Sequence, residues 1–298
     1  MSAAHIRTGI GGWTFEPWRG TFYPEKLAQA KELAFASRAL GSIEINGTYY
    51  RSQTPATYAK WAGEVPDGFV FALKGPRFAT NRRVLGEAGD SISRFLDSGP
   101  TMLGDRLGPM LWQFAPTKKF DAADFGAFLE LLPKSFDGRT LRHTVEVRHP
   151  TFQCAEFVAL LRDFEIPVVY ADHPEYPAIA DLTGDFVYAR LQKGEDDIPT
   201  CYPPKEIKDW AKAAATWAEG GAPEKTAAHV VGPALAKSKS KPRDVFVYFI
   251  HGGKIRAPAA AQALAQALGT PIGAQARDAE TGGTEKPSKP APKAKRTK

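Results

Sequence analysis

Short apolar runs with strand character alternate with helical patterns along most of this chain, and this alternation restricts the fold more than any other feature. Between the runs, apolar residues recur at helical spacing, as in Phe125, Phe128 and Leu129 behind the capping residue Asp121. Eight strands with helices between them in roughly 265 residues predict an α/β fold, a single-domain (β/α)8 barrel of TIM type. The eight strand-like runs are 6–12, 42–48, 69–74, 107–114, 143–148, 167–172, 185–191 and 244–251.

Two parts of the barrel pattern are irregular. The sixth unit offers only a short stretch near 178–182 where a helix is expected. Residues 221–243, before the last predicted strand, contain four Lys and one Arg and predict a mobile basic loop. We therefore expect a barrel domain over 1–273 that includes this loop and has a short or irregular sixth unit.

The net charge of +6 comes from the C-terminal end of the chain. Six of the 39 basic residues follow the last acidic residue, Glu285, so the 33 basic residues before it balance the 33 acidic ones. Residues 274–298 are rich in Lys and Pro and predict a disordered basic tail, because they cannot bury enough apolar surface to offset their conformational entropy. Such a tail could make a weak contact with nucleic acid or serve only to raise solubility.

The cellular compartment is predicted from features that the sequence lacks. No stretch has the roughly 18–20 apolar residues of a membrane span, and no signal-peptide core precedes the first predicted strand. The two cysteines, Cys154 and Cys201, are too few for a disulfide framework and lack metal-site spacing. We expect a reduced, cytoplasmic protein with no membrane partner.

Polar side chains interrupt the apolar pattern where several predicted strands end. In two strands, Ile or Val residues take one face, while Glu44 with Asn46, and Glu146 with Arg148, take the other. The apolar face belongs under the helices, so we expect the polar face to point into the barrel mouth, where active sites of this fold lie. The other strand ends add Lys74, Gln113, Asp172, Arg190 and His251.

Two interpretations of this cluster stay open. In the first, three carboxylates and three cations neutralise one another in a salt-bridge network that plugs the barrel. In the second, they line a ligand pocket in which a carboxylate acts as general base and the cations bind an anionic group. Under the second interpretation the candidate catalytic residues are Glu44, Glu146 and Asp172. The candidate ligand-binding residues are Trp13, Asn46, Lys74, Gln113, Arg148, Arg190 and His251.

Other motifs are weaker. The glycines of 9–12 lack the helix that follows a phosphate-binding loop at once, and they predict a tight turn. Trp13 could stack on a sugar or base, or could pack as part of a lid. No catalytic triad and no cofactor or metal motif stands out, so we expect neither a cofactor nor a resident metal.

Six segments taken together resemble the YecE-like family, which is named for domain of unknown function 72. The resemblance spans about residues 6–268 and implies a TIM-type barrel, but it implies no reaction. Where the family commonly has a histidine at the seventh strand this chain has Gln192, and where it commonly has an Asn pair at the eighth strand this chain has Ile250 and His251. The matching segments are 11–13 (with Trp18 and 22–24 as parts of the same segment), 44–50, 71–74, 112–116, 146–149 and 172–174.

The leading hypothesis is a barrel whose mouth binds a small anionic or polyhydroxylated ligand, with acid–base chemistry as a further expectation. One alternative is a metal-dependent barrel resembling sugar isomerases or abasic-site endonucleases, with Glu44, Glu146, Asp172 and His251 as ligands. The interleaved Lys and Arg residues argue against it, because they compete for the same carboxylates. A second alternative is a non-enzymatic, nucleic-acid-associated protein that uses the basic tail. The oligomeric state is left open by the sequence.

Overall fold

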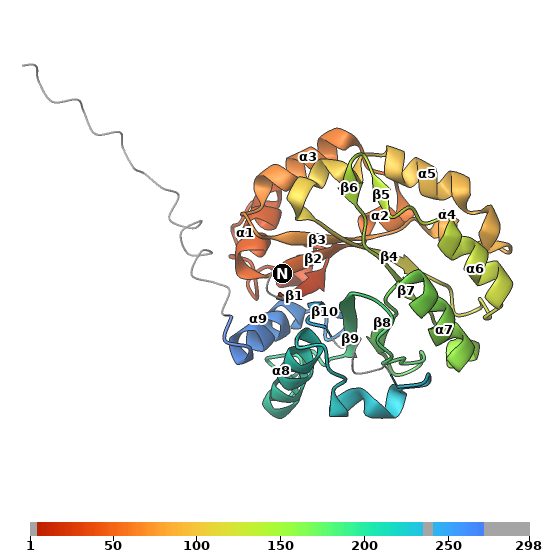
Figure 1. Ribbon diagram of the computed structural model, residues 1–298. Helices are drawn as coiled ribbons and strands as arrows, with labels where there is room; N and C mark the ends of the chain where they lie inside the picture. The colour runs from red at the N-terminus through yellow and green to blue at the C-terminus, as the bar shows by residue number, and fades with distance from the viewer. Residues whose placement is uncertain (1–4, 235–240, 271–298) are drawn as a thin grey trace, which may run out of the picture.

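Eight parallel strands lie at the centre of the molecule and form a nearly closed barrel (Figure 1). The structure is a computed structural model that describes residues 5–234 and 241–270. All eight predicted strands are confirmed, with ends that differ by a few residues. In chain order the strands are β1 (Ile6–Gly11), β2 (Ser42–Ile45), β3 (Val70–Lys74), β4 (Leu107–Gln113), β7 (His143–Glu146), β8 (Val169–Asp172), β9 (Phe186–Lys193) and β10 (Asp244–Gly252).

The strands are hydrogen-bonded in the order β7-β4-β3-β2-β1-β10-β9-β8. The two strands at the ends of this order, β7 and β8, meet through an isolated parallel bridge between Val145 and Val168. The backbone N–H of Val145 donates to the carbonyl of Pro167 at 3.1 Å, and the Thr144 hydroxyl donates to the same carbonyl at 2.8 Å. The barrel therefore has a seam between β7 and β8 that carries far less backbone pairing than its other strand contacts.

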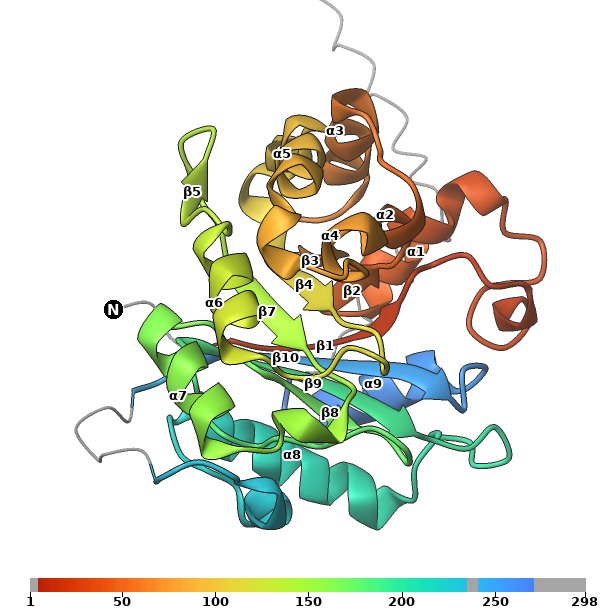
Figure 2. The ribbon, with the colours of Figure 1, turned by 90° about the vertical axis from the view of Figure 1, so that its right-hand side faces the viewer.

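Helices surround the strands on the outside of the barrel (Figure 2). A short hairpin, β5 (Ser135–Phe136) and β6 (Arg139–Thr140), projects between α6 and β7. The α-helices are α1 (Glu32–Ala39), α2 (Gly47–Tyr50), α3 (Pro55–Glu64), α4 (Arg77–Thr80), α5 (Gly89–Asp97), α6 (Ala122–Glu130), α7 (Ala155–Phe164), α8 (Pro204–Ala218) and α9 (Ala257–Ala267). The 3-10 helices are η1 (Glu16–Trp18), η2 (Gln29–Lys31), η3 (Leu85–Glu87), η4 (Pro100–Arg106), η5 (Pro150–Phe152) and η6 (Glu224–His229).

Local sequence explains where these helices begin. The side chain of Asp121 accepts a hydrogen bond from the backbone N–H of Asp124 at 2.9 Å, which is the predicted N-cap of α6. Pro55 occupies the first turn of α3, where a missing N–H costs nothing. These signals are local, so they could be read from the sequence without knowledge of the packing.

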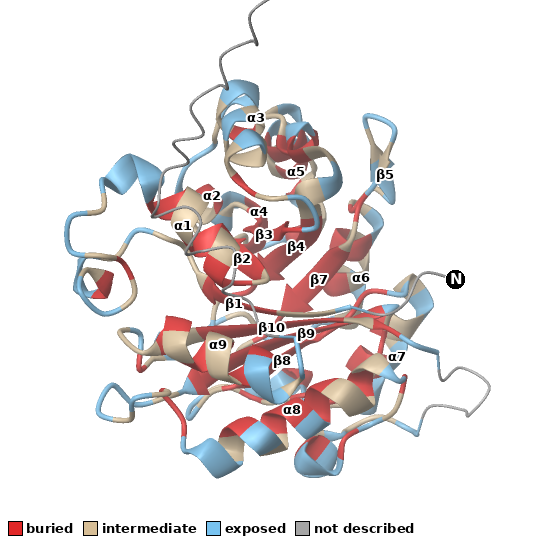
Figure 3. Cartoon of the chain, turned by 90° about the vertical axis from the view of Figure 1, so that its left-hand side faces the viewer, coloured by how far each residue is buried: buried red, intermediate tan, exposed pale blue. Residues whose placement is uncertain are grey.

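The apolar side chains form two layers, one on each side of the strands. The larger layer lies between strands and helices, and the smaller layer fills the barrel interior with residues such as Val70, Leu111 and Phe246. Buried residues accordingly follow the strands and the inner helix faces, while exposed residues lie on the outer faces and loops (Figure 3). Side chains alternate along each strand, so they point in turn to one layer or the other.

The sixth unit has no helix between β8 and β9 in the structure, and part of the predicted basic loop lies beside it. The backbone N–H of Ala180 donates to the carbonyl of His229 in η6 at 3.0 Å. Both carboxylate oxygens of Asp181 accept backbone N–H groups, from Val231 at 2.8 Å and from Gly232 at 3.1 Å. Residues 229–232 of the predicted loop are thus hydrogen-bonded to the chain that replaces the sixth helix. Residues 235–240 lie outside the described part.

The predicted tail, 274–298, lies wholly outside the described residues. Among the residues that the structure does describe, no helix combines the length and the apolar character that crossing a membrane requires.

Candidate functional site

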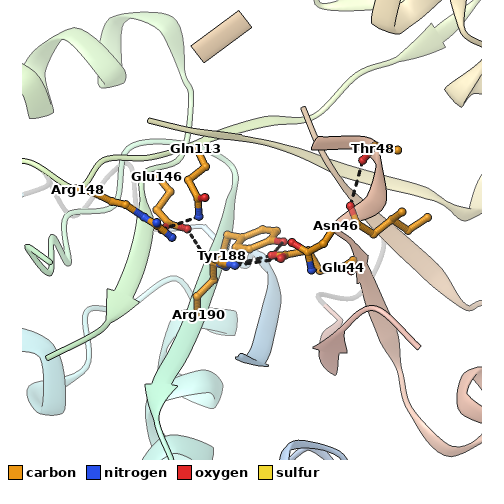
Figure 4. Close-up of polar contacts among 9 residues, drawn as sticks. Glu44, Asn46, Thr48, Gln113, Glu146, Arg148, Tyr188 and Arg190 are labelled. Carbon is orange, nitrogen blue, oxygen red and sulfur yellow. Dashed lines mark hydrogen bonds and ion pairs between the residues drawn. The ribbon is translucent and has the colours of Figure 1, made fainter. Parts of the chain in front are cut away.

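Arg190 of β9 lies between two buried carboxylates at the C-terminal end of the barrel (Figure 4). Its Nε and Nη2 each donate to the carboxylate of Glu44 in β2, both at 3.2 Å, so this pair is bidentate. Its Nη1 donates to Glu146 in β7 through a short hydrogen bond. Glu44 and Glu146 are 0% exposed and Arg190 is 3% exposed. One guanidinium therefore connects three strands that are not neighbours in the sheet.

Three further donors complete the surroundings of the two carboxylates. The hydroxyl of Tyr188 donates to Glu44 at 2.6 Å. On Glu146, the same oxygen accepts from Nε2 of Gln113 at 3.0 Å and from Nε of Arg148 at 2.8 Å. Every carboxylate oxygen of the pair is thus hydrogen-bonded, which is what a buried charge requires. These contacts of Glu44, Glu146 and Arg190 are the ones that the salt-bridge interpretation describes.

The cluster fixes the ionisation of its members. Burial by itself would raise the pKa of Glu146, but Arg190, Arg148 and Lys74 outweigh burial and lower that pKa to about 2. Burial would also lower the pKa of Arg190, but Glu146 and Glu44 outweigh it and raise that pKa above its usual value. Burial and the Glu44 charge raise the pKa of Tyr188 well above its usual value. Near neutral pH, Glu146 is ionised and Tyr188 keeps its proton.

Lys74, at the end of β3, differs from the other cations of the cluster. It is 7% exposed, and its Nζ lies 4.2 Å from the ring centre of Tyr49 in α2. Within the described chain it forms no ion pair with a carboxylate. Burial lowers the pKa of the Lys74 ammonium to about 8, and the neighbouring Arg190 charge acts in the same direction. Lys74 is therefore a buried amine whose charge is poorly compensated.

Two further donors at the mouth have spare capacity. The guanidinium of Arg148 lies 4.5 Å from the ring centre of Tyr176, and only its Nε is bonded to a protein acceptor in the part of the chain described. Gln192 lies two residues beyond Arg190 on the same face of β9. It is 4% exposed, and its Nε2 finds no acceptor among residues 5–234 and 241–270. A buried amide donor without an acceptor is uncommon and calls for an explanation.

Six of the ten predicted site residues are brought together at the mouth: Glu44, Lys74, Gln113, Glu146, Arg148 and Arg190. Asn46 lies beside them, on the mouth side of β2. A Cβ added at Gly11 would meet its Nδ2 at 2.9 Å, so the Asn46 amide lies close against β1.

Three predicted site residues lie elsewhere. Asp172 pairs with Lys193 at 2.7 Å, and alternation along β8 and β9 places both on the helix side of the barrel wall. Trp13 packs against Trp61 at 5.2 Å between ring centres, in the layer between strands and helices. His251 is exposed, has a φ of +76°, and lies 5.7 Å from the ring of His173.

Because Asp172 lies outside the mouth, the charge balance of the mouth differs from the predicted one. Alternation assigns side chains to the two faces of a strand only when the face of one residue is known. Because β8 has no polar–apolar pattern in the sequence, the face of Asp172 could not be assigned. Without Asp172, the charged groups that act on one another are three cations, Lys74, Arg148 and Arg190, and two carboxylates, Glu44 and Glu146. Among the described residues the mouth therefore carries one positive charge in excess, and Lys74 is the one of these three cations that has no ion-pair partner there.

The tyrosines whose rings lie against Lys74 and Arg148, which are Tyr49 and Tyr176, do not follow from the pattern of polar strand ends. Tyr188 and Gln192 do follow from the sequence, which places them on the same face as Arg190 because they alternate with it along one strand. Tyr49 and Tyr176 lie on a short helix and a loop, where no period relates them to the strand ends. Nothing in their spacing identifies them.

The four residues of the metal-dependent alternative are not grouped. Arg190 binds Glu44 and Glu146, Lys193 binds Asp172, and His251 lies beside His173. Across the described ranges, no three His, Cys, Asp or Glu side chains are arranged so that they could hold a metal ion.

Comparison with solved structures finds this barrel in other proteins. A DUF72 family protein from Enterococcus faecalis V583 matches with a TM-score of 0.64 and 18% identity, covering 89% of this chain and 95% of that one. A DUF72 family protein from Thermotoga maritima MSB8 matches with a TM-score of 0.62 and 22% identity, covering 87% and 96% of the two chains. At these identities the likeness shows the fold alone.

Comparison of sequences shows which proteins and which family the chain is related to. The UPF0759 protein YunF of Bacillus subtilis strain 168 is 27% identical over 116 residues, which span 37% of this chain and 40% of that protein. The family described as "Protein of unknown function DUF72" matches residues 7–283. Since this match covers most of the chain and includes the strand ends that form the polar cluster, the chain belongs to the DUF72 family.

Proposed function

We propose that the C-terminal mouth of the barrel binds a small anionic or polyhydroxylated ligand between Lys74 and Arg148. The observation that carries the proposal is the single excess positive charge of the mouth, located on a buried lysine without an ion-pair partner in the described chain. A buried cation without a counter-charge is costly. An anion in contact with Lys74 and with the free nitrogens of Arg148 would offset that cost.

Gln192 supports the same proposal independently of charge. Its buried amide offers a donor with no acceptor among the described residues, on the face of β9 that carries Arg190. Oxygen atoms of a phosphate, carboxylate or sugar would satisfy this donor. Ligands of this chemistry are therefore favoured over apolar or cationic ones.

In this proposal the carboxylates position cations and do not act as bases. All oxygens of Glu44 and Glu146 are engaged, and a pKa of about 2 makes Glu146 a weak base near neutral pH. Any acid–base step would fall to Lys74, whose pKa of about 8 lies near the working pH. The catalytic and ligand-binding roles predicted for Asp172, Trp13 and His251 do not enter this proposal.

The test is calorimetric titration of the protein with inorganic phosphate, ribose 5-phosphate, AMP and citrate. We expect at least one of these anions to bind the parent, and Lys74→Met to weaken binding by about tenfold or more, the worth of one charged hydrogen bond. The matched control is Lys193→Met, which removes a lysine that pairs with Asp172 outside the mouth. Equal loss in both variants, or no binding of any probe below about 1 mM, would overturn the proposal.

A further inference from the structure

The geometry points to a covalent role for Lys74: we propose that its amine forms an imine with a small ligand that carries both a carbonyl and an anionic group. This inference rests on the proposed function, because the anionic group must first be held at the mouth. It narrows the ligand class to molecules such as 2-oxo acids and phosphorylated aldehydes.

The environment of Lys74 favours a neutral amine. The groups that face it are Glu44 from β2, Tyr49 from α2, Glu146 and Arg148 from the end of β7, and Arg190 from β9. Both carboxylates are already bound by guanidinium groups, so neither is free to hold an ammonium. Desolvation and neighbouring cations are the two means by which proteins make a lysine nucleophilic, and both act here.

The neighbouring donors suit an acidic group on the same molecule. Arg148 has terminal nitrogens that bind no acceptor in the described residues, and its guanidinium carbon lies 4.5 Å from the ring centre of Tyr176. A guanidinium edge of this kind matches a carboxylate or phosphate in a bidentate manner. The amide of Gln192 adds a donor for a further oxygen. The amine of Lys74 and the neighbouring guanidinium of Arg148 are therefore complementary to a molecule that carries a carbonyl and an acidic group.

The step is a condensation and needs no oxidant or reductant. The lone pair of Lys74 Nζ attacks the carbonyl carbon, forming the C–N bond, and the carbonyl oxygen takes up a proton as the nitrogen loses one. The resulting carbinolamine then loses its hydroxyl group, which leaves with a proton as water. The nitrogen lone pair forms the C=N bond, and the protonated imine withdraws electrons from the adjacent carbon atom.

The experiment traps this imine in the full-length protein. The parent is incubated with pyruvate or with glyceraldehyde 3-phosphate, reduced with sodium borohydride, and analysed by intact mass and peptide mapping. We expect one adduct per chain, on the peptide that contains Lys74, and trapping that rises with pH to half its maximum near pH 8. Lactate is the matched ligand control, because it has the carboxylate of pyruvate but no carbonyl.

Two variants separate the possible outcomes. Lys74→Arg keeps the positive charge and is expected to bind pyruvate in calorimetry yet form no adduct, whereas Lys193→Arg is expected to be trapped like the parent. If the parent binds pyruvate or lactate but adducts are absent or scattered over surface lysines, the imine is overturned and the anion site stands. If the parent binds neither the carbonyl compounds nor lactate, the imine is overturned, and the proposed function is decided separately by the titrations with phosphate, ribose 5-phosphate, AMP and citrate.

Discussion

At the scale of single residues, burial divides the charges of the mouth into two groups. Glu44, Glu146 and Arg190 satisfy one another, and removal of any one leaves the others buried without compensation. Lys74 lies against the same cluster but gains no ion pair in the described chain. We expect the first group, Glu44, Glu146 and Arg190, to stabilise the folded protein when it is intact. We expect the second, Lys74, to lower the stability of the folded protein.

Glu146→Gln tests the first group. We expect a fall of about 3–5 kcal/mol in the free energy of unfolding at pH 7, because Arg190 and Arg148 lose a buried counter-charge. The folded pKa of Glu146, about 2, lies below that of an ordinary Glu, so its contribution is complete above about pH 4.5 and is lost as pH falls toward 2. Urea unfolding of parent and variant from pH 7 to pH 3 measures both effects.

The matched control for Glu146→Gln is Glu130→Gln, at an exposed position near the end of α6. This change is expected to stay within about 0.5 kcal/mol of the parent. A Glu146→Gln protein as stable as the control would show that water screens the cluster, as the ligand-pocket interpretation of the charges requires.

Lys74→Met tests the second group and is expected to stabilise the protein. The folded pKa of about 8 lies below that of an ordinary lysine, so the unfolded state binds more protons between pH 8 and about pH 10.5. Parent stability should therefore rise with pH across this interval. The variant should exceed the parent by up to about 3 kcal/mol at pH 7, and the difference should shrink toward pH 10.5.

Thermal melts at a series of pH values measure this difference. Lys208→Met, at an exposed position on α8, is the control and should show no such pH dependence. A Lys74→Met variant that is less stable than the parent at pH 7 would mean that Lys74 is compensated in the folded state.

At the scale of secondary-structure elements, the sequence predicts what is periodic and local. The eight strands could be predicted because short apolar runs alternate with helical patterns along the chain. The start of α6 could be predicted because one side chain, Asp121, caps it. The polar ends of β2 and β7 could also be assigned to the barrel interior, because their apolar residues alternate with polar ones. Asp172 could not be placed, because β8 is apolar on both faces and gives no phase.

The replacement of the sixth helix could not be predicted either, because it depends on contacts over long sequence distance. Asp181 is followed by β9 and α8 before the chain returns at Val231 and Gly232 to donate to its carboxylate. A basic, glycine-containing stretch with no helical period predicts a loop. Only the folded barrel brings that loop beside the uncovered strand.

Asp181→Ala tests whether this carboxylate holds residues 230–232. Two backbone N–H groups lose their acceptor, so we expect a loss of about 1–3 kcal/mol in stability and faster amide exchange at Val231 and Gly232. Hydrogen exchange followed by mass spectrometry reports on the segment. The control is Asp163→Ala, at an exposed position on α7. Equal exchange in both variants would show that other contacts fix the segment.

At the scale of the whole molecule, the charge is unevenly distributed along the chain. Acidic and basic residues balance up to Glu285, and the excess of six follows it. A contact with nucleic acid through these charges would be electrostatic and independent of base sequence. The neutral body would contribute little to it.

Removal of residues 275–298 tests this distribution. We expect the full chain to bind duplex DNA weakly, with a logarithmic salt dependence of at most about 5 for six charges, and the shortened chain not to bind. The melting temperature should be the same in both. A shortened chain that binds DNA tightly near physiological salt would place a specific site on the barrel itself.

The seam between β7 and β8 gives the buried guanidinium a further consequence. Arg190 reaches from β9 past β8 to Glu146 on β7, so the bond that organises the mouth also spans the weakest line of the barrel wall. Opening of the seam and binding of a ligand at the mouth therefore both affect the contact of Arg190 with Glu146. A ligand that strengthens the contact of Arg190 with Glu146 would shift the equilibrium of the seam toward its closed state, and a barrel held closed would bind that ligand more tightly by the same factor. Because the seam between β7 and β8 has little backbone pairing, ligand binding at the mouth can change how firmly the barrel is closed.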